Sequence, residues 1–163
     1  SGGMIAALCD GLGHGQLAAT ASRAALEAVT EEPDAEPAVL LERAHRRMGG
    51  TRGGALAIVA ADNEVVRFAG LGNVAGWILS GETRQGMVSV PGIAGHQARK
   101  FRQFEYAAAA GSVVVLHSDG LSSRWDITGL PGLTAQDPLV IAAGLLSEAG
   151  VRRDDAGVLV LRP

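Results

Sequence analysis

The chain has 163 residues, of which 47% are hydrophobic and 19% are charged, and its formal net charge is −3. This length is typical of one domain with one hydrophobic core, and the composition excludes an intrinsically disordered chain. No apolar stretch approaches the ~20 residues that a transmembrane helix needs, and the mildly acidic balance is unlike that of nucleic-acid-binding domains. Neither a membrane nor a nucleic acid is therefore expected as a partner.

The one cysteine, Cys9, has no second thiol with which to form an internal disulfide or a zinc site. The sequence does not open with a basic segment followed by an apolar one, so no secretion signal is expected. Both features favour a cytoplasmic protein.

The start of the sequence predicts a buried strand and two helices. Residues 4–9 form a short apolar run that is bounded by glycines, as is typical of a buried strand. Apolar residues recur at helical spacing over residues 17–31 and 36–48. These two segments are predicted to be helices, with Leu17 and Val39 on their buried faces.

The rest of the sequence is mostly β-like, because short apolar runs alternate with turn residues such as Asp62-Asn63. Strands are predicted at residues 55–60, 65–69, 74–79, 86–90, 103–108, 113–116 and 156–161, and a helix at 137–148. A helix pair, a run of hairpins and a final helix and strand favour an α+β domain of antiparallel sheets over a parallel sheet of βαβ units.

Three aspartates lie where an apolar strand is predicted to begin or end: Asp10, Asp119 and Asp154. Because strand ends at one edge of a sheet can converge, these carboxylates could share one pocket. Carboxylates brought together repel one another, and burying them without neutralisation is costly or raises their pKa values. A hard divalent cation, Mg²⁺ or Mn²⁺, would remove that cost through all-oxygen ligation. Gly11 leaves its carbonyl group free to approach such an ion.

Asp-Gly is also a common turn dipeptide, so the spacing alone leaves a metal site and separate surface turns both open. The glycines around His14 precede a helix, where anions can bind, but the sequence lacks the features of a dinucleotide-binding loop, a Walker loop or a nucleophile elbow. His14 could contact a substrate or protonate its leaving group, or it could be a polar rim residue. Arg52 could bind an anionic substrate, or it could be an exposed loop arginine.

The segment Cys9-Asp10-Gly11-Leu12-Gly13-His14-Gly15, followed by an alanine-rich helix, resembles the Asp-Gly-x-Gly-His-Gly signature of PPM-type protein phosphatases. Further similar segments follow in the family's order at residues 51–55, 70–74, 116–120 and 154–155. The sequence is most similar to the bacterial sporulation stage II E and stress-response branch, whose members dephosphorylate regulators of sigma factors.

The resemblance implies a single domain over residues 1–163 in which two antiparallel β-sheets pack as a sandwich flanked by α-helices. It also implies a centre of two Mn²⁺ or Mg²⁺ ions. In that centre Asp10 would bridge both ions, the Gly11 carbonyl would bind one, and Asp119 and Asp154 would complete the other. The three aspartates are thus the implied catalytic residues, and His14 and Arg52 are candidates for substrate binding.

The sequence departs from the family pattern in two ways. Family members usually carry one or two further acidic residues on a strand before the one that ends at Asp10, so this domain is expected to lack its first strands and the second metal site is in doubt. Eukaryotic-type members also have a histidine where this chain has Leu12.

The expected activity is hydrolysis of phosphoserine or phosphothreonine on a bacterial signalling regulator by metal-activated water. The implied partner is a phosphorylated regulatory protein of the anti-sigma antagonist type. Two alternatives are open. An incomplete metal shell would leave a phosphatase-like module that binds a regulatory partner without turnover, and the same metal chemistry would suit a small-molecule phosphohydrolase.

Overall fold

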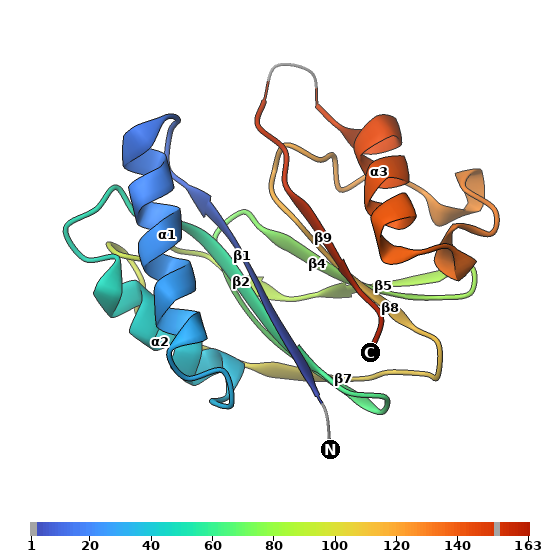
Figure 1. Ribbon diagram of the computed structural model, residues 1–163, viewed down its shortest axis with the longest axis horizontal. Coiled ribbons are helices and arrows are strands. Elements are labelled where there is room, and N and C mark those ends of the chain that lie inside the picture. Colours follow the sequence, from blue (N-terminus) through green and yellow to red (C-terminus); the bar gives the residue numbers. More distant parts are fainter. Residues whose placement is uncertain (1–2, 152–153) are drawn as a thin grey trace.

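Residues 3–151 and 154–163 are described by a computed structural model, shown in Figure 1. These residues form nine β-strands, three α-helices and two short 3₁₀-helices. The helices are α1 (Gln16–Thr30), α2 (Pro37–Arg47), η1 (Ile127–Gly129), η2 (Leu133–Ala135) and α3 (Pro138–Ala149). The strands are β1 (Met4–Gly11), β2 (Gly54–Ala61), β3 (Val65–Leu71), β4 (Ala75–Ser80), β5 (Thr83–Met87), β6 (Ser89–Val90), β7 (Phe104–Ala107), β8 (Val113–His117) and β9 (Val158–Leu161).

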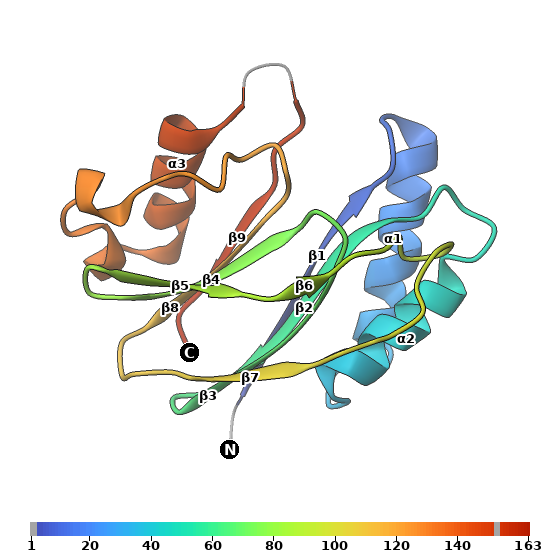
Figure 2. The ribbon, with the colours of Figure 1, turned by 180° about the vertical axis from the view of Figure 1, so that it is seen from behind.

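The strands form two sheets. In the first sheet β1, β2 and β3 are neighbours, and β3 pairs with β7 along its first half and with β6 at its end. The second sheet has the order β5-β4-β8-β9. All pairs are antiparallel except the two-residue pairing of β3 with β6. Seen from both sides, the sheets lie between α1 and α2 at one end and α3 at the other (Figures 1 and 2). The predicted α+β sandwich of antiparallel sheets is confirmed.

The predicted strand at residues 86–90 is instead two strands, β5 and β6. β5 begins earlier, at Thr83, and forms a hairpin with β4. It is an edge strand with mostly exposed or half-buried polar residues, so it lacks the apolar alternation by which strands are recognised in a sequence.

The inner core lies between the two sheets. Val59 of β2 and Phe68 of β3 contribute to it from the first sheet, and Val114 and Leu116 of β8 from the second. Phe68 is completely buried. Because side chains alternate between the faces of a strand, the residues between these positions face outward and form the cores under the helices.

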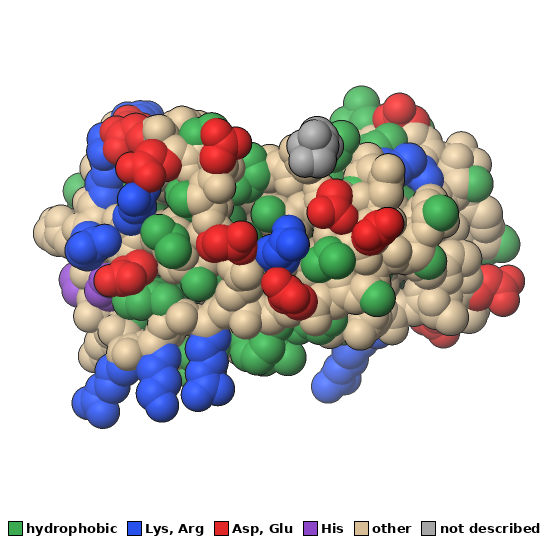
Figure 3. Space-filling view, turned by 90° about the horizontal axis from the view of Figure 1, so that it is seen from below, with side chains coloured by type: hydrophobic (Ala, Val, Ile, Leu, Met, Phe, Trp, Pro, Cys, Tyr) green, Lys and Arg blue, Asp and Glu red, His purple; other side chains and the backbone are tan. Residues whose placement is uncertain are grey.

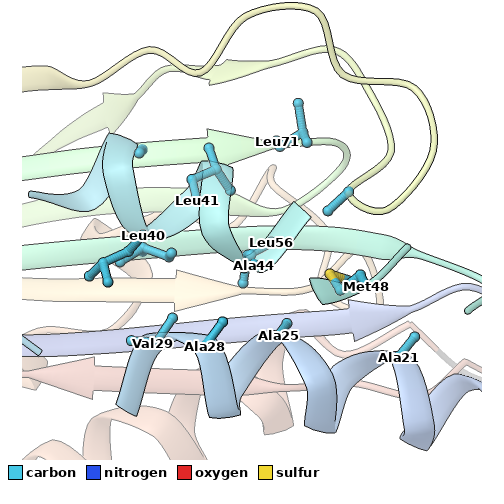
Figure 4. Packing of buried hydrophobic residues seen from close by; sticks show 13 residues of the cluster. Ala21, Ala25, Ala28, Val29, Leu40, Leu41, Ala44, Met48, Leu56 and Leu71 are labelled. Atoms are coloured by element: carbon cyan, nitrogen blue, oxygen red, sulfur yellow. The ribbon is translucent and has the colours of Figure 1, made fainter. Parts of the chain in front are cut away.

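The second core lies between the first sheet and the two N-terminal helices (Figure 4). Its labelled members come from α1 and α2, the turn after α2, and β2 and β3: Ala21, Ala25, Ala28, Val29, Leu40, Leu41, Ala44, Met48, Leu56 and Leu71. Small alanine side chains on α1 allow its backbone to approach the sheet closely. The predictions for Leu17 and Val39 are wrong, since these residues are 57% and 43% exposed. Each directly precedes a buried residue and so lies about 100° around its helix from the buried stripe.

The third core lies between the second sheet and α3. Val113 and Val115 of β8 face this side, opposite Ile141 and Leu145 of α3. Consecutive residues of β8 therefore serve two different cores, and the whole strand is buried. Within the described part of the chain, no helix has the length and apolar character needed to cross a membrane.

Candidate functional site

A pocket of about 490 Å³ opens where the ends of the two sheets meet. It contains most of the residues that the sequence singles out. Its lining residues are Asp10, Gly11, Leu12, Gly13, His14, Ala55, Asn73, Asp119, Asp154 and Asp155. The structure therefore brings Asp10, Asp119 and Asp154 to one pocket, although they are far apart in the sequence.

Asp10 and Asp119 come from different sheets. Asp10 is the penultimate residue of β1 in the first sheet, whereas Asp119 follows β8 of the second sheet. The acids thus meet at the shared end of two stacked sheets, and not at one edge of a single sheet as the strand-end argument supposed. Strand spacing cannot distinguish these arrangements, because the stacking of sheets depends on contacts between distant residues.

Two glycines allow the backbone segments around the pocket to approach one another. A β-carbon at Gly11 would overlap the carbonyl group of Ala18, so the first turn of α1 can lie against the end of β1 only because residue 11 is glycine. A β-carbon at Gly120 would overlap the carbonyl group of Asp155. The second contact brings the loop after Asp119 against the segment around Asp154.

The pocket is electrostatically unfavourable for Asp10. Burial raises the pKa of the Asp10 carboxyl above its ordinary value, and the nearby charge of Asp119 and a hydrogen bond shared with it raise it further. Asp154 and Asp155 contribute smaller effects in the same direction. Among the described residues, no lysine, arginine or histidine forms an ion pair with these four carboxylates. The local excess of negative charge is the property that a divalent cation would relieve.

Asn73 is a site residue to which the sequence assigned no role. It follows β3, lines the pocket and donates a hydrogen bond from its side-chain amide to Oδ2 of Asp119. Asp154 is held locally, since its Oδ1 accepts a hydrogen bond of 2.9 Å from the backbone N–H of Asp155. The Gly72-Asn73 turn beside a predicted strand was the available signal for Asn73, but only the fold shows that it faces Asp119.

The acidic residues share the pocket without forming a compact three-residue cluster. Within residues 3–151 and 154–163, no three His, Cys, Asp or Glu side chains are grouped closely enough to hold a metal ion. Asp10 and Asp119 are the close pair, because their side chains share a hydrogen bond. Asp154 lines the same pocket and is exposed.

The two candidate substrate-binding residues lie at different places. His14 lines the pocket and is exposed. Arg52 is exposed and does not line the pocket, but its guanidinium group lies beside Gly13, where a β-carbon would be 2.7 Å from Nη1. Arg52 is therefore a rim residue, next to the glycine-rich loop.

The strand that leads to Asp119 is held by buried polar residues. Trp77 Nε1 donates to His117 Nε2 over 3.0 Å, so His117 carries its proton on Nδ1 and donates it to the Ser118 carbonyl group over 2.8 Å. Burial lowers the pKa of His117, which favours this neutral form. Ser118 Oγ accepts a hydrogen bond of 2.9 Å from the Gly157 N–H. The residues just before Asp119 are thus tied to those just after Asp154.

Comparisons with known proteins agree with this architecture. The family model described as stage II sporulation protein E (SpoIIE) matches residues 1–163. A structure from work on the bacterial stressosome, described there as a modular system that controls secondary messenger signalling, is 26% identical with a TM-score of 0.88, over 99% of this chain and 86% of that chain. RsbX in complex with magnesium is 22% identical with a TM-score of 0.80, over 97% and 80%.

The catalytic domain of the serine/threonine protein phosphatase PstP, in complex with two manganese ions, is 18% identical with a TM-score of 0.71. The similarity covers 97% of this chain and 96% of that chain. None of the curated proteins compared with the chain matches it. Since the family model extends over the whole sequence, this protein belongs to the SpoIIE family and has the fold of the PPM-type phosphatases.

Proposed function

We propose that this domain is a metal-dependent phosphatase that hydrolyses phosphoserine or phosphothreonine on a regulatory phosphoprotein. The observation that carries the proposal is the pairing of Asp10 with Asp119 in an open pocket, where burial and the nearby charge of Asp119 raise the pKa of Asp10. Family membership and the similarity to a manganese-bound phosphatase domain support the same reaction class.

The residues of the pocket suit a hard divalent cation. Asp10, Asp119 and the Gly11 carbonyl group would hold it, and all three supply oxygen ligands, which Mn²⁺ and Mg²⁺ prefer. Asp154 would join them by turning its exposed side chain. Such an ion, when bound, lowers the pKa of a water molecule and stabilises the charge that develops on a phosphoryl group.

The other pocket residues would orient the ligands and the substrate. The amide of Asn73 donates to Oδ2 of Asp119, which fixes the orientation of that carboxylate and leaves Oδ1 for a ligand. His14 is exposed on the pocket wall, where it would contact the phosphoester. Leu12 offers no proton, so the leaving group would take its proton from water or from His14.

The expected substrate is a phosphorylated regulatory protein of the anti-sigma antagonist type. Structural similarity to a stressosome protein and to RsbX supports a regulatory partner. Comparison of a phosphoprotein with free phosphoserine separates this proposal from a small-molecule phosphohydrolase, because only a protein phosphatase would strongly prefer the phosphoprotein.

The test measures hydrolysis of a phosphoserine peptide and of p-nitrophenyl phosphate, with Mn²⁺ or with a chelator. We expect Mn²⁺-dependent turnover that falls at least 100-fold in Asp10→Asn and in Asp119→Asn, in the range of losses found when electrostatic catalytic groups are removed. Asp34→Asn is the matched control, because Asp34 is an exposed aspartate that does not line this pocket. Equal rates in all four proteins would show that the proposed site is wrong.

One observation favours a second candidate, a phosphatase-like module that binds its partner without turnover. The described residues contain no compact group of three metal-ligating side chains. Calorimetry distinguishes the candidates: a module would bind the phosphoprotein but not Mn²⁺, whereas a phosphatase would bind both.

A further inference from the structure

The segment between β6 and β7 is basic, although the chain as a whole is acidic. Between Glu82 and Glu105 the sequence contains no aspartate or glutamate, while Arg99, Lys100 and Arg102 follow one another closely. All three of these side chains are exposed. Among the described residues, none of them takes part in an ion pair. Basic side chains extend into solvent along the edge of the molecule on the side of α1 and α2 (Figure 3).

Apolar residues anchor this segment and leave its cations outside. Ala98 and Phe101 pack against the core beneath α1 and α2. The ring of Phe101 also lies 5.2 Å from the ring of His45 on α2. Arg99 and Lys100 therefore project from backbone that is fixed on both sides, which reduces the conformational entropy lost when they bind a partner.

The turn before the cations is held in the same way. Ile93 and Gln97 exchange two backbone hydrogen bonds of 2.8 and 3.0 Å. The N–H of Gly95 donates to His45 Nδ1 over 3.0 Å, and His96 Nε2 lies 2.7 Å from the carbonyl oxygen of Thr51. Since Thr51 directly precedes Arg52, this turn is fastened to the rim of the catalytic pocket.

A groove of about 720 Å³ lies along this segment and is lined in part by His96, Arg99 and Lys100. It adjoins the candidate catalytic pocket at two points. At the first, a β-carbon on Gly72 would lie 2.9 Å from Ala55 Cβ, which lines the pocket, and 3.1 Å from the carbonyl oxygen of Gly92, which lines the groove.

At the second point of contact, Gly53 lies between the candidate catalytic pocket and the groove. Its carbonyl oxygen accepts a hydrogen bond of 2.9 Å from the N–H of Leu12, a pocket residue. On its other side, a β-carbon would lie 2.7 Å from Cδ2 of His96, a groove residue. A single backbone segment thus separates the pocket from the groove, and Arg52 lies beside this partition.

We propose that the groove and its cations dock an acidic stretch of the phosphoprotein whose phosphorylated residue enters the pocket. The inference rests on the proposed function and specifies its substrate class. The pocket itself is lined by four carboxylates, so it cannot attract an acidic protein without a metal ion, whereas the groove can attract one by complementary charge. The acidic residues would lie a few positions from the phosphorylated residue, because an extended peptide spans ~3.3 Å per residue and has to cross only the single backbone segment at Gly53.

The test uses fluorescence anisotropy with labelled phosphoserine peptides in a chelator, so that binding is measured without turnover. One peptide carries four aspartates beginning three residues from the phosphoserine, and the other carries serines there. The groove variant is Arg99→Glu/Lys100→Glu. The matched control is Arg23→Glu/Arg46→Glu, which changes the net charge equally at two exposed arginines that line neither the pocket nor the groove.

We expect the wild-type protein and the control variant to prefer the acidic peptide, and the groove variant to bind it about tenfold more weakly, as the reversal of two exposed charges implies. The preference should decline from 50 to 500 mM salt because these charges are screened. Equal affinity for both peptides, or an equal loss in the control variant, would overturn the proposal. So would tighter binding of a single-stranded oligonucleotide or of anionic vesicles that depends on the same two cations.

Failure of the proposed function gives a different result. If the domain hydrolyses neither p-nitrophenyl phosphate nor either peptide with Mn²⁺, it is not a phosphatase. The peptide preference in the chelator then still decides whether the groove binds an acidic segment. If hydrolysis occurs without a preference between peptides, the docking proposal fails and the phosphatase stands.

Discussion

Asn in place of Asp10 should make the metal-free protein more stable at neutral pH, although it removes the central group of the candidate site. Two carboxylates ~5 Å apart repel by about 1–2 kcal/mol at an effective dielectric constant near 40. Asp119 is exposed and Asp10 only partly buried, so solvent screening reduces the expected gain to about 1 kcal/mol. For a domain of this size, that corresponds to an increase in Tm of roughly 2–4 °C.

The pH dependence of this gain follows from the direction of the pKa shift. The pKa of Asp10 is raised in the folded protein, so the wild-type free energy of unfolding falls as pH rises from the unfolded-state value, about 3.9, through the folded-state value. The advantage of Asp10→Asn should therefore be complete above the folded-state pKa and absent near pH 3, where residue 10 is uncharged in both proteins.

Addition of Mn²⁺ should reverse the order of stability. A ligand at 100 times its Kd stabilises the folded state by about 2.7 kcal/mol, and only the wild-type protein should gain this amount. The assay is thermal unfolding by circular dichroism at pH 3 and pH 7, with a chelator or with Mn²⁺, and Asp34→Asn serves as the control. A lower Tm for Asp10→Asn at pH 7 in the chelator would refute the repulsion argument, and equal stabilisation of both proteins by Mn²⁺ would refute ligation by Asp10.

Three further substitutions test the core, the buried support of the site and its rim. Phe68→Ala should lower the free energy of unfolding by about 3–5 kcal/mol in urea titrations, since Phe68 is completely buried between the sheets; a loss below about 1 kcal/mol would contradict that placement. Trp77→Phe should cost about 1–3 kcal/mol because His117 Nε2 loses its donor, and an unchanged stability would mean that this hydrogen bond contributes nothing. His14→Ala should raise KM for a phosphopeptide several-fold and lower kcat less than about tenfold, since His14 is exposed and a positioned general acid contributes 10²–10⁴-fold; a larger loss of kcat would identify His14 as that acid.

The element order could be predicted because local signals are strong where one face of an element is buried. Alanines at helical spacing identify α1, and the apolar run that ends at His117 identifies β8. Prediction was weaker for exposed residues, because exposed positions do not follow a regular apolar pattern. β5 was placed incorrectly because most of its residues face solvent, and Leu17 was placed inside because it is apolar, although it lies beside the buried stripe of its helix.

Some features of the candidate site could also be predicted from the sequence, and others could not. The identity of its oxygen ligands and their preference for a hard cation follow from residue types alone, and so does the resemblance that led to the SpoIIE family. The role of Asn73 and the adjacency of the basic groove to the pocket could not be predicted from the sequence. Both depend on the turn after β3, in which Asn73 faces Asp119 and Gly72 lies between Ala55 and Gly92.

The amino-acid sequence by itself determined most of the elements, most of their apolar faces and which carboxylates are available, because these properties depend on residues a few positions apart. Only the tertiary structure decided that Asp10 and Asp119 meet from two different sheets and that the groove lined by Arg99 and Lys100 adjoins their pocket. The meeting of the two aspartates arises from the stacking of one sheet on another, and the free energy of stacking comes from buried side chains such as Phe68 and Leu116, which do not line the pocket.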